Sequence, residues 1–136
     1  MRTIFVTLLG LVLGFFFGEA LTALAGMISF AAGEPFDPER IDADPELGDV
    51  ELWRIRGLNL EHPIHLHLVR FQVLTVGGGN GDTGPYNQGW KDTVSLSSGG
   101  ETELLVRFDG YRGKYVFRCH NLEHEDMMMM ANFEVV

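Results

Sequence analysis

The chain has 136 residues, which is enough for one domain of ordinary size and too short for two. Hydrophobic residues make up 46% and charged residues 21%, a globular composition that excludes a disordered tail. The formal net charge of -9 argues against nucleic acid or an anionic lipid surface as a partner, because both require a basic footprint. The single cysteine, Cys119, excludes an intramolecular disulfide.

The chain opens with an apolar run from Ile4 to Gly18, preceded by Arg2 and continued, after Glu19, to Gly33. One interpretation is a signal peptide over residues 1–25, because a positive start, an apolar core and small residues before the cleavage site are all present. The other is an uncleaved membrane anchor, which needs about 20 apolar residues and would bury Glu19. Both predict a hydrophobic N-terminal helix or signal segment, a single domain over residues 26–136, and export to the extracellular, cell-surface or periplasmic side.

The remaining chain has a sequence pattern typical of a β-sandwich. Residues 36–45 are acidic and proline-rich and predict an extended loop, whereas the apolar segments that follow are short and separated by glycines. We expect no helix after the N-terminal segment, and we expect a hairpin tip at Gly77–Gly81. The predicted strands are Val50–Ile55, Leu66–Val76, Thr93–Leu96, Glu103–Phe108, Tyr115–Cys119 and Asn132–Val136. The aromatic residues expected in the core are Trp53, Phe71, Trp90, Phe108, Phe117 and Phe133.

All five histidines fall in two short segments, which core packing alone does not explain. The segments are His62-Pro63-Ile64-His65-Leu66-His67 and Cys119-His120-Asn121-Leu122-Glu123-His124, and four methionines, Met127 to Met130, follow the second one. The concentration of imidazole, thiol and thioether groups predicts a metal site.

The ligand types favour copper over zinc. Two histidines and a cysteine with a weak axial methionine form the blue-copper electron-transfer site, whereas structural zinc prefers two or more cysteines. The spacing Cys119, His124, Met129 places three ligands on one loop between two strands, and His62 would attach that loop to the opposite sheet. The other three methionines are more simply explained as packing residues.

Strand alternation separates the other histidines from this site. Side chains at positions i and i+2 share a face, so His65 and His67 point together, while His120 points away from Cys119 toward the side of Arg118. His65, His67 and His120 therefore form a second cluster, which could hold a second copper.

These motifs resemble the C-terminal cupredoxin (plastocyanin-like) domain of multicopper oxidases, most closely the spore-coat laccase and bilirubin oxidase group. The resemblance covers roughly residues 34–136. Beside the two histidine-rich motifs, it rests on Gly89-Trp90-Lys91-Asp92-Thr93 and Gly48-Asp49-Val50-Glu51-Leu52-Trp53. It implies an all-β, Greek-key cupredoxin-like β-sandwich.

The resemblance also implies a role for each ligand. His62, Cys119, His124 and Met129 would bind the type 1 copper, His65 would face the type 2 copper, and His67 and His120 the type 3 pair, where oxygen is reduced. Glu125 resembles the family's acidic residue near the oxygen site and is a candidate catalytic proton donor. Its simpler interpretation is a solvated loop carboxylate.

Two features depart from the family. Arg118 stands where the family has a histidine, and a guanidinium cannot ligate copper. The N-terminal domain that supplies half of the histidines of the trinuclear cluster is absent from these 136 residues. We therefore do not expect this chain alone to reduce oxygen to water.

Three hypotheses follow. The chain could be a type 1 electron-transfer domain that serves a redox partner protein or a small reductant. It could instead be a component of a split laccase-like or bilirubin-oxidase-like enzyme, with the missing cupredoxin domain supplied in trans. It could also be a module that sequesters copper without turnover.

Overall fold

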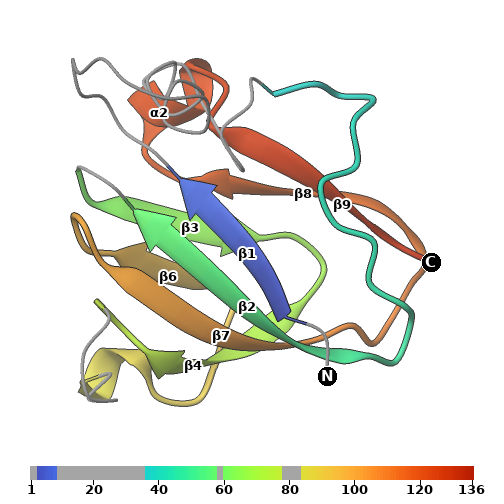
Figure 1. The fold of residues 1–136 in the computed structure, drawn as a ribbon, viewed down its shortest axis with the longest axis horizontal. Coiled ribbons are helices and arrows are strands. Elements are labelled where there is room, and N and C mark those ends of the chain that lie inside the picture. The colour runs from blue at the N-terminus through green and yellow to red at the C-terminus, as the bar shows by residue number, and fades with distance from the viewer. Residues whose placement is uncertain (1–2, 9–35, 58–59, 78–83) are drawn as a thin grey trace.

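The computed structural model describes residues 3–8, 36–57, 60–77 and 84–136 as two facing β-sheets (Figure 1). The five-stranded sheet has the order β1 (Thr3–Leu8), β2 (Val50–Gly57), β7 (Glu101–Arg107), β4 (Arg70–Thr75) and β5 (Trp90–Lys91). The four-stranded sheet has the order β6 (Thr93–Leu96), β3 (His62–Leu66), β8 (Gly113–Cys119) and β9 (Met130–Val135). β1 pairs with β2 in parallel, and the pairings among β2 to β9 are antiparallel. The predicted all-β sandwich is confirmed.

Alternation along the strands builds the core between the sheets. In β7, Thr102, Leu104 and Val106 are buried, while the intervening side chains are not. Trp53 of β2 lies at the centre, because its ring centroid is 5.7 Å from that of Phe108 and 5.6 Å from that of Phe117. Five of the six aromatic residues expected in the core are fully buried: Trp53, Phe71, Phe108, Phe117 and Phe133.

Trp90 is the exception, and its assignment to the core was wrong. It lies on β5, a strand of only two residues at the edge of its sheet, and it is 54% exposed. More than half of the residue's surface therefore faces solvent instead of the opposite sheet.

The predicted strand over Leu66–Val76 was wrong at its beginning. β3 ends at Leu66 and β4 begins at Arg70, because the chain turns between them: the backbone N–H of Val69 donates to the carbonyl of His67 at 2.8 Å, and Leu68 has a positive φ of 68°. The turn lets one apolar stretch contribute a strand to each sheet. The hairpin tip expected at Gly77–Gly81 lies, apart from Gly77, outside the described residues.

The expectation of no helix after the N-terminal segment was also wrong. A 3-10 turn, η2, spans Pro85–Asn87, and a short α-helix, α2, spans Leu122–Asp126. The side chain of Asn121 accepts a hydrogen bond from the backbone N–H of Glu123 and caps α2. A helix of 5 residues is too short to show a helical period in the sequence.

The N-terminal segment differs from the expected helix where the structure describes it, since Thr3–Leu8 is the strand β1. The rest of the apolar run, residues 9–35, lies outside the described residues, and so does the expected cleavage site. Among the described residues, no helix has the length and apolar character needed to cross a membrane.

Residues 36–45 form a loop, as predicted, although a turn at Pro38–Glu39 interrupts the expected extended course, and Asn132 of β9 holds the loop in place. This buried side chain donates to the carbonyls of Asp37 and Arg40, both at 2.9 Å, and the Asn132 carbonyl accepts from the N–H of Asp42 at 2.9 Å. The side-chain amide of Asn132 therefore provides hydrogen bonds to backbone carbonyls in a segment that forms no strand.

Candidate metal centre

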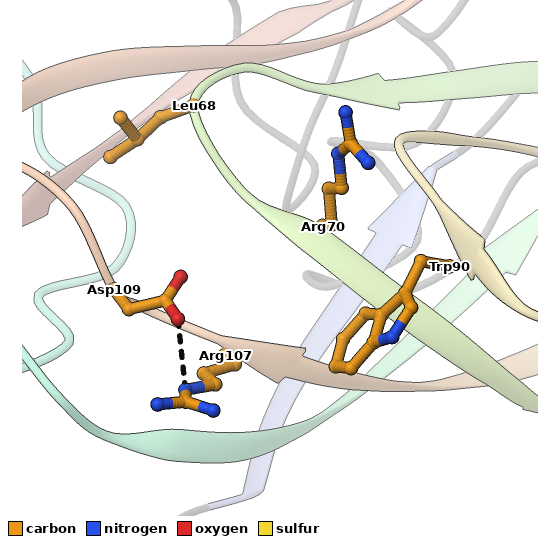
Figure 2. A pocket seen from close by; sticks show the side chains of 5 residues that line it. All are labelled: Leu68, Arg70, Trp90, Arg107 and Asp109. Atoms are coloured by element: carbon orange, nitrogen blue, oxygen red, sulfur yellow. Dashed lines mark ion pairs between the residues drawn. The ribbon is translucent and has the colours of Figure 1, made fainter.

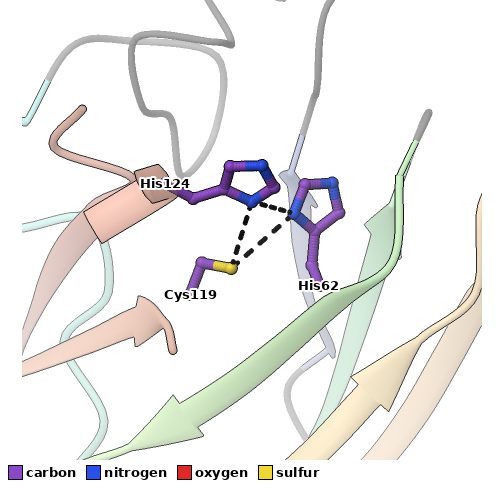
Figure 3. A group of neighbouring side chains, drawn as sticks. All are labelled: His62, Cys119 and His124. Carbon is purple, nitrogen blue, oxygen red and sulfur yellow. Dashed lines mark hydrogen bonds between the residues drawn. The ribbon is translucent and has the colours of Figure 1, made fainter. Parts of the chain in front are cut away.

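Three donor atoms converge at one end of the four-stranded sheet (Figure 3). The Nδ1 atoms of His62 and His124 lie 3.1 Å apart, and the sulfur of Cys119 lies 3.7 Å from the first and 3.5 Å from the second. Within the described part of the chain, they form the only group of three ligand-type side chains whose donor atoms all lie within 4.8 Å of one another.

Strand register explains how residues so distant in sequence meet. His62 is the first residue of β3 and shares its buried face with Ile64, which pairs directly with Cys119 at the end of β8. His124 comes from α2, the helix that follows β8. The expectation that His62 attaches the ligand loop to the opposite sheet was therefore wrong: β3 and β8 are neighbouring strands of the same sheet.

Met129 is tied to the same place through its backbone. Its N–H donates to the carbonyl of His124 at 2.9 Å, and its carbonyl accepts from the N–H of Cys119 at 3.0 Å. The residue is 1% exposed, so its thioether is shielded from water. Met128, just before it, has a positive φ of 66°, which is rare for a side chain of this kind and marks a conformation held by its surroundings.

The three donor atoms fit a copper-sized ion. The point equidistant from them lies about 2 Å from each atom, close to the ~2.0–2.1 Å of a metal–imidazole bond. The remaining ring nitrogen of His62, Nε2, is buried and has no hydrogen-bond partner among the described residues, so no protein contact draws this imidazole away from the centre. Two imidazoles and one thiolate are the soft-to-borderline set that suits copper.

Burial sets the protonation of the ligands. It lowers the pKa of His62 from 6.5 to about 4, with a smaller contribution from the neighbouring His124. Burial raises the pKa of the Cys119 thiol, opposed by a backbone hydrogen bond from Asn121. At neutral pH, His62 thus offers a free lone pair, whereas Cys119 must lose a proton to become a ligand.

The second histidine cluster also assembles, but with a different geometry. The ring of His65 lies 4.9 Å from that of His67 and 5.6 Å from that of His120, centroid to centroid. Nδ1 of His65 is within hydrogen-bonding distance of the carbonyl oxygen of Asp92, at 3.0 Å, and of the hydroxyl of Thr93, at 3.1 Å. The donor atoms of the three rings do not gather within 4.8 Å of one another, so the described residues do not converge on one metal position here.

Arg118 occupies the side of β8 that faces this cluster. Its guanidinium forms an ion pair with Glu125 and approaches Nε2 of His120 at 3.5 Å. The pKa of His67 is lowered, first by burial and then by the charges of His65 and Arg118. The pairing of Arg118 with Glu125 was not expected from the sequence, in which Glu125 was a candidate proton donor or a solvated carboxylate. In the sequence, the one signal for this ion pair is that Arg118 and Glu125 carry opposite charges just before and just after the Cys119–His124 motif.

Comparison with known proteins gives the family. A family model described as multicopper oxidase matches residues 18–136, which is most of the chain. The chain belongs to the multicopper oxidase family. The match begins inside the segment expected to be a signal peptide or anchor.

Individual relatives agree with this multicopper oxidase assignment. The chain is 42% identical to a laccase of Haloferax volcanii over 105 residues, which cover 76% of this chain and 18% of that protein. It is 40% identical to the bilirubin oxidase of Albifimbria verrucaria over 98 residues, which cover 69% of this chain and 17% of that protein. The chain thus spans about a fifth of the curated relatives it matches.

Solved structures confirm the fold. A laccase-like multicopper oxidase from an Ochrobactrum species superposes with a TM-score of 0.69 at 40% identity, over 78% of this chain and 24% of that one. A multicopper oxidase from Pediococcus acidilactici superposes with a TM-score of 0.80 at 26% identity, over 99% of this chain and 26% of that one. The chain is therefore a copper-binding, oxidoreductase-type domain with the cupredoxin-like sandwich of this family.

Proposed function

We propose that this domain holds a type 1 copper and transfers single electrons. His62, Cys119 and His124 would be the strong ligands, and the thioether of Met129 a weaker one. The observation that carries the proposal is the convergence of the two Nδ1 atoms and the thiol sulfur within 3.7 Å of one another. When bound, the metal would supply a one-electron Cu(II)/Cu(I) couple.

The chain serves this role by holding the ligands rigidly and excluding water from them. His62 and Cys119 are fully buried, and both are fixed on paired strands. A rigid and water-excluded ligand set changes little between two oxidation states, which favours rapid electron exchange.

His124 gives this ligand set its contact with solvent. It is only half-buried on α2, and Leu122 and Met128, which flank it in the sequence, are 68% and 46% exposed. We propose that Leu122 and Met128 form the contact for a redox partner protein or a small reductant. Apolar side chains beside a half-buried ligand let an electron donor approach closely while water stays excluded from the other ligands.

A partner-dependent enzyme component is the second candidate, and the cluster of His65, His67 and His120 favours it. The rings of His67 and His120 lie within 5.6 Å of that of His65, centroid to centroid. His65 alternates with His62 along β3, so the cluster is separate from the proposed copper ligands. Under this hypothesis, a cupredoxin domain supplied in trans completes the second copper site. Arg118, paired with Glu125, then stands where the family has a histidine ligand. Copper sequestration without turnover is the third candidate, and it predicts no reversible couple.

Voltammetry of the copper-loaded full chain tests the proposal. We expect a reversible one-electron couple whose potential rises in Met129→Leu, because the thioether ligand is lost. Met128→Leu is the matched control, since it changes the neighbouring exposed methionine, and it should leave the potential unchanged. Equal potentials in all three proteins would refute Met129 as a ligand, and the absence of any reversible couple would refute electron transfer.

Oxygen uptake separates the two leading candidates. The chain alone, given a phenolic reductant, should consume no oxygen if it is an electron-transfer domain. Uptake that requires an added two-domain partner, and that rises further in Arg118→His, would instead establish the enzyme component.

A further inference from the structure

A separate hollow lies on the outer face of the five-stranded sheet (Figure 2). It has a volume of about 350 Å³ and is lined by Leu68, Arg70, Trp90, Arg107 and Asp109. None of these residues belongs to the copper ligands or to the second histidine cluster. The volume falls within the range of small-molecule sites.

The charges in this hollow are not balanced. Arg70 of β4 and Arg107 of β7 are directly opposite each other in the register, and like charges in that position are unfavourable. Nε of Arg107 pairs with a carboxylate oxygen of Asp109 at 3.0 Å, whereas the guanidinium of Arg70 has no ion-pair or hydrogen-bond partner among the described residues. The lining therefore carries a net single positive charge on a chain whose formal net charge is -9.

The remaining lining is apolar and exposed. Trp90 is 54% exposed and Leu68 36% exposed, although both are large side chains that normally pack in a core. Figure 2 shows the indole of Trp90 extending from the edge strand toward the hollow, with Leu68 on the other side. A flat aromatic surface beside an unpaired guanidinium is suited to a ligand with one apolar and one anionic end.

The backbone at the rim is strained. Leu68 has a φ of 68°, and among the described residues only Leu68 and Met128 have a positive φ without being glycine. Met128 adjoins the copper ligands. Because such conformations concentrate at functional sites, the strain at Leu68 is a second and independent sign that this hollow is a site.

We propose that the hollow binds a monovalent aromatic carboxylate, with its carboxylate on Arg70 and its ring between Trp90 and Leu68. The planar guanidinium offers two parallel N–H donors that match the two oxygens of a carboxylate. Asp109 neutralises Arg107 and would repel a second negative charge, so a dianion such as a phosphate monoester is disfavoured. Binding would give Arg70 an anionic partner, as Asp109 already does for Arg107, and would weaken the remaining Arg70–Arg107 repulsion.

Amide NMR of the full chain tests this inference with benzoate as the probe. The protein has two indole N–H signals: Trp90 reports on the hollow, and Trp53 is an internal control, because it is fully buried and donates to Glu51 at 2.9 Å. We expect benzoate to shift the Trp90 signal in a saturable way and to leave that of Trp53 unmoved. Benzamide, which lacks the charge, and acetate, which lacks the ring, should each bind at least about tenfold more weakly.

Variants locate the interaction. Arg70→Met keeps the apolar stem but removes the charge, and it should weaken benzoate binding about tenfold or more. Arg56→Met is the matched control, since Arg56 lies on another strand of the same sheet and is already paired with Glu101 at 3.3 Å; it should change nothing.

Unchanged affinity in Arg70→Met would overturn the inference, and so would equal affinity for benzoate and benzamide. Equal affinity for acetate would overturn the part assigned to the ring. The readout is an indole signal and does not depend on copper, so failure here leaves the proposed electron-transfer function intact.

Discussion

Acid should destabilise the metal-free chain through His62. An ordinary histidine in the unfolded chain takes up a proton as the pH falls through about 6.5, whereas burial holds the pKa of folded His62 at about 4. Between these values the unfolded state binds more protons than the folded one, so this contribution to stability is complete above pH 6.5 and is lost as the pH falls toward 4. One pKa unit corresponds to about 1.4 kcal/mol, so the loss attributable to His62 at pH 4.5 is about 2.5 kcal/mol.

Urea unfolding of the full chain and of His62→Asn, each at pH 7.5 and pH 4.5, measures this loss. The chain has 19 carboxylate residues whose own titration also contributes, so the informative quantity is the difference between the two proteins. The variant should lose about 2.5 kcal/mol less on acidification than the unsubstituted chain. An NMR titration should show the His62 imidazole still neutral at about pH 5. Equal acid losses in the two proteins, or a His62 signal that titrates at an ordinary value, would refute the reasoning.

Three further outcomes follow from the same geometry. Copper loading at pH 7.5 should release about one proton per metal, because burial raises the pKa of the Cys119 thiol; a pH indicator dye reads the release, which Cys119→Ser should abolish. Asn132→Ala should cost about 2 kcal/mol and expose residues 36–45 to protease, because two buried hydrogen bonds of 2.9 Å are lost; unaltered cleavage would contradict this. Gly100→Ala should cost about 1–3 kcal/mol in a urea titration, because its Cβ would lie 2.7 Å from the Cα of Gly77, and an unchanged midpoint would show that the two turns are not packed together.

The sequence predicted the fold class, and it singled out three donor side chains that the structure brings together, because both inferences rest on local patterns. Alternation with buried aromatic residues is visible in each strand, and the spacing from Cys119 to His124 fits a single loop. Strand order depends on long-range pairing instead, so the sequence could not show that β3 lies beside β8, or that His62 therefore comes from the same sheet as Cys119.

Local deviations were the other features that the sequence concealed. The turn at Leu68 interrupts a run of apolar residues that the sequence predicted as one strand. The turn could not be predicted, because a positive φ at leucine has no sequence signal. Trp90 reads as a core residue from its type alone, and only its place on a two-residue edge strand exposes it. The Arg118–Glu125 ion pair depends on α2, whose 5 residues are too few for a period.

Copper titration of the full chain, followed by visible absorption and EPR, tests the central claim most directly. The account predicts an intense blue charge-transfer band and a narrow copper hyperfine splitting at one copper per chain. Both should be lost in Cys119→Ser and retained in His65→Ala, which removes a histidine of the second cluster only. A colourless copper site with an ordinary hyperfine splitting, or a blue band that survives in Cys119→Ser, would contradict it.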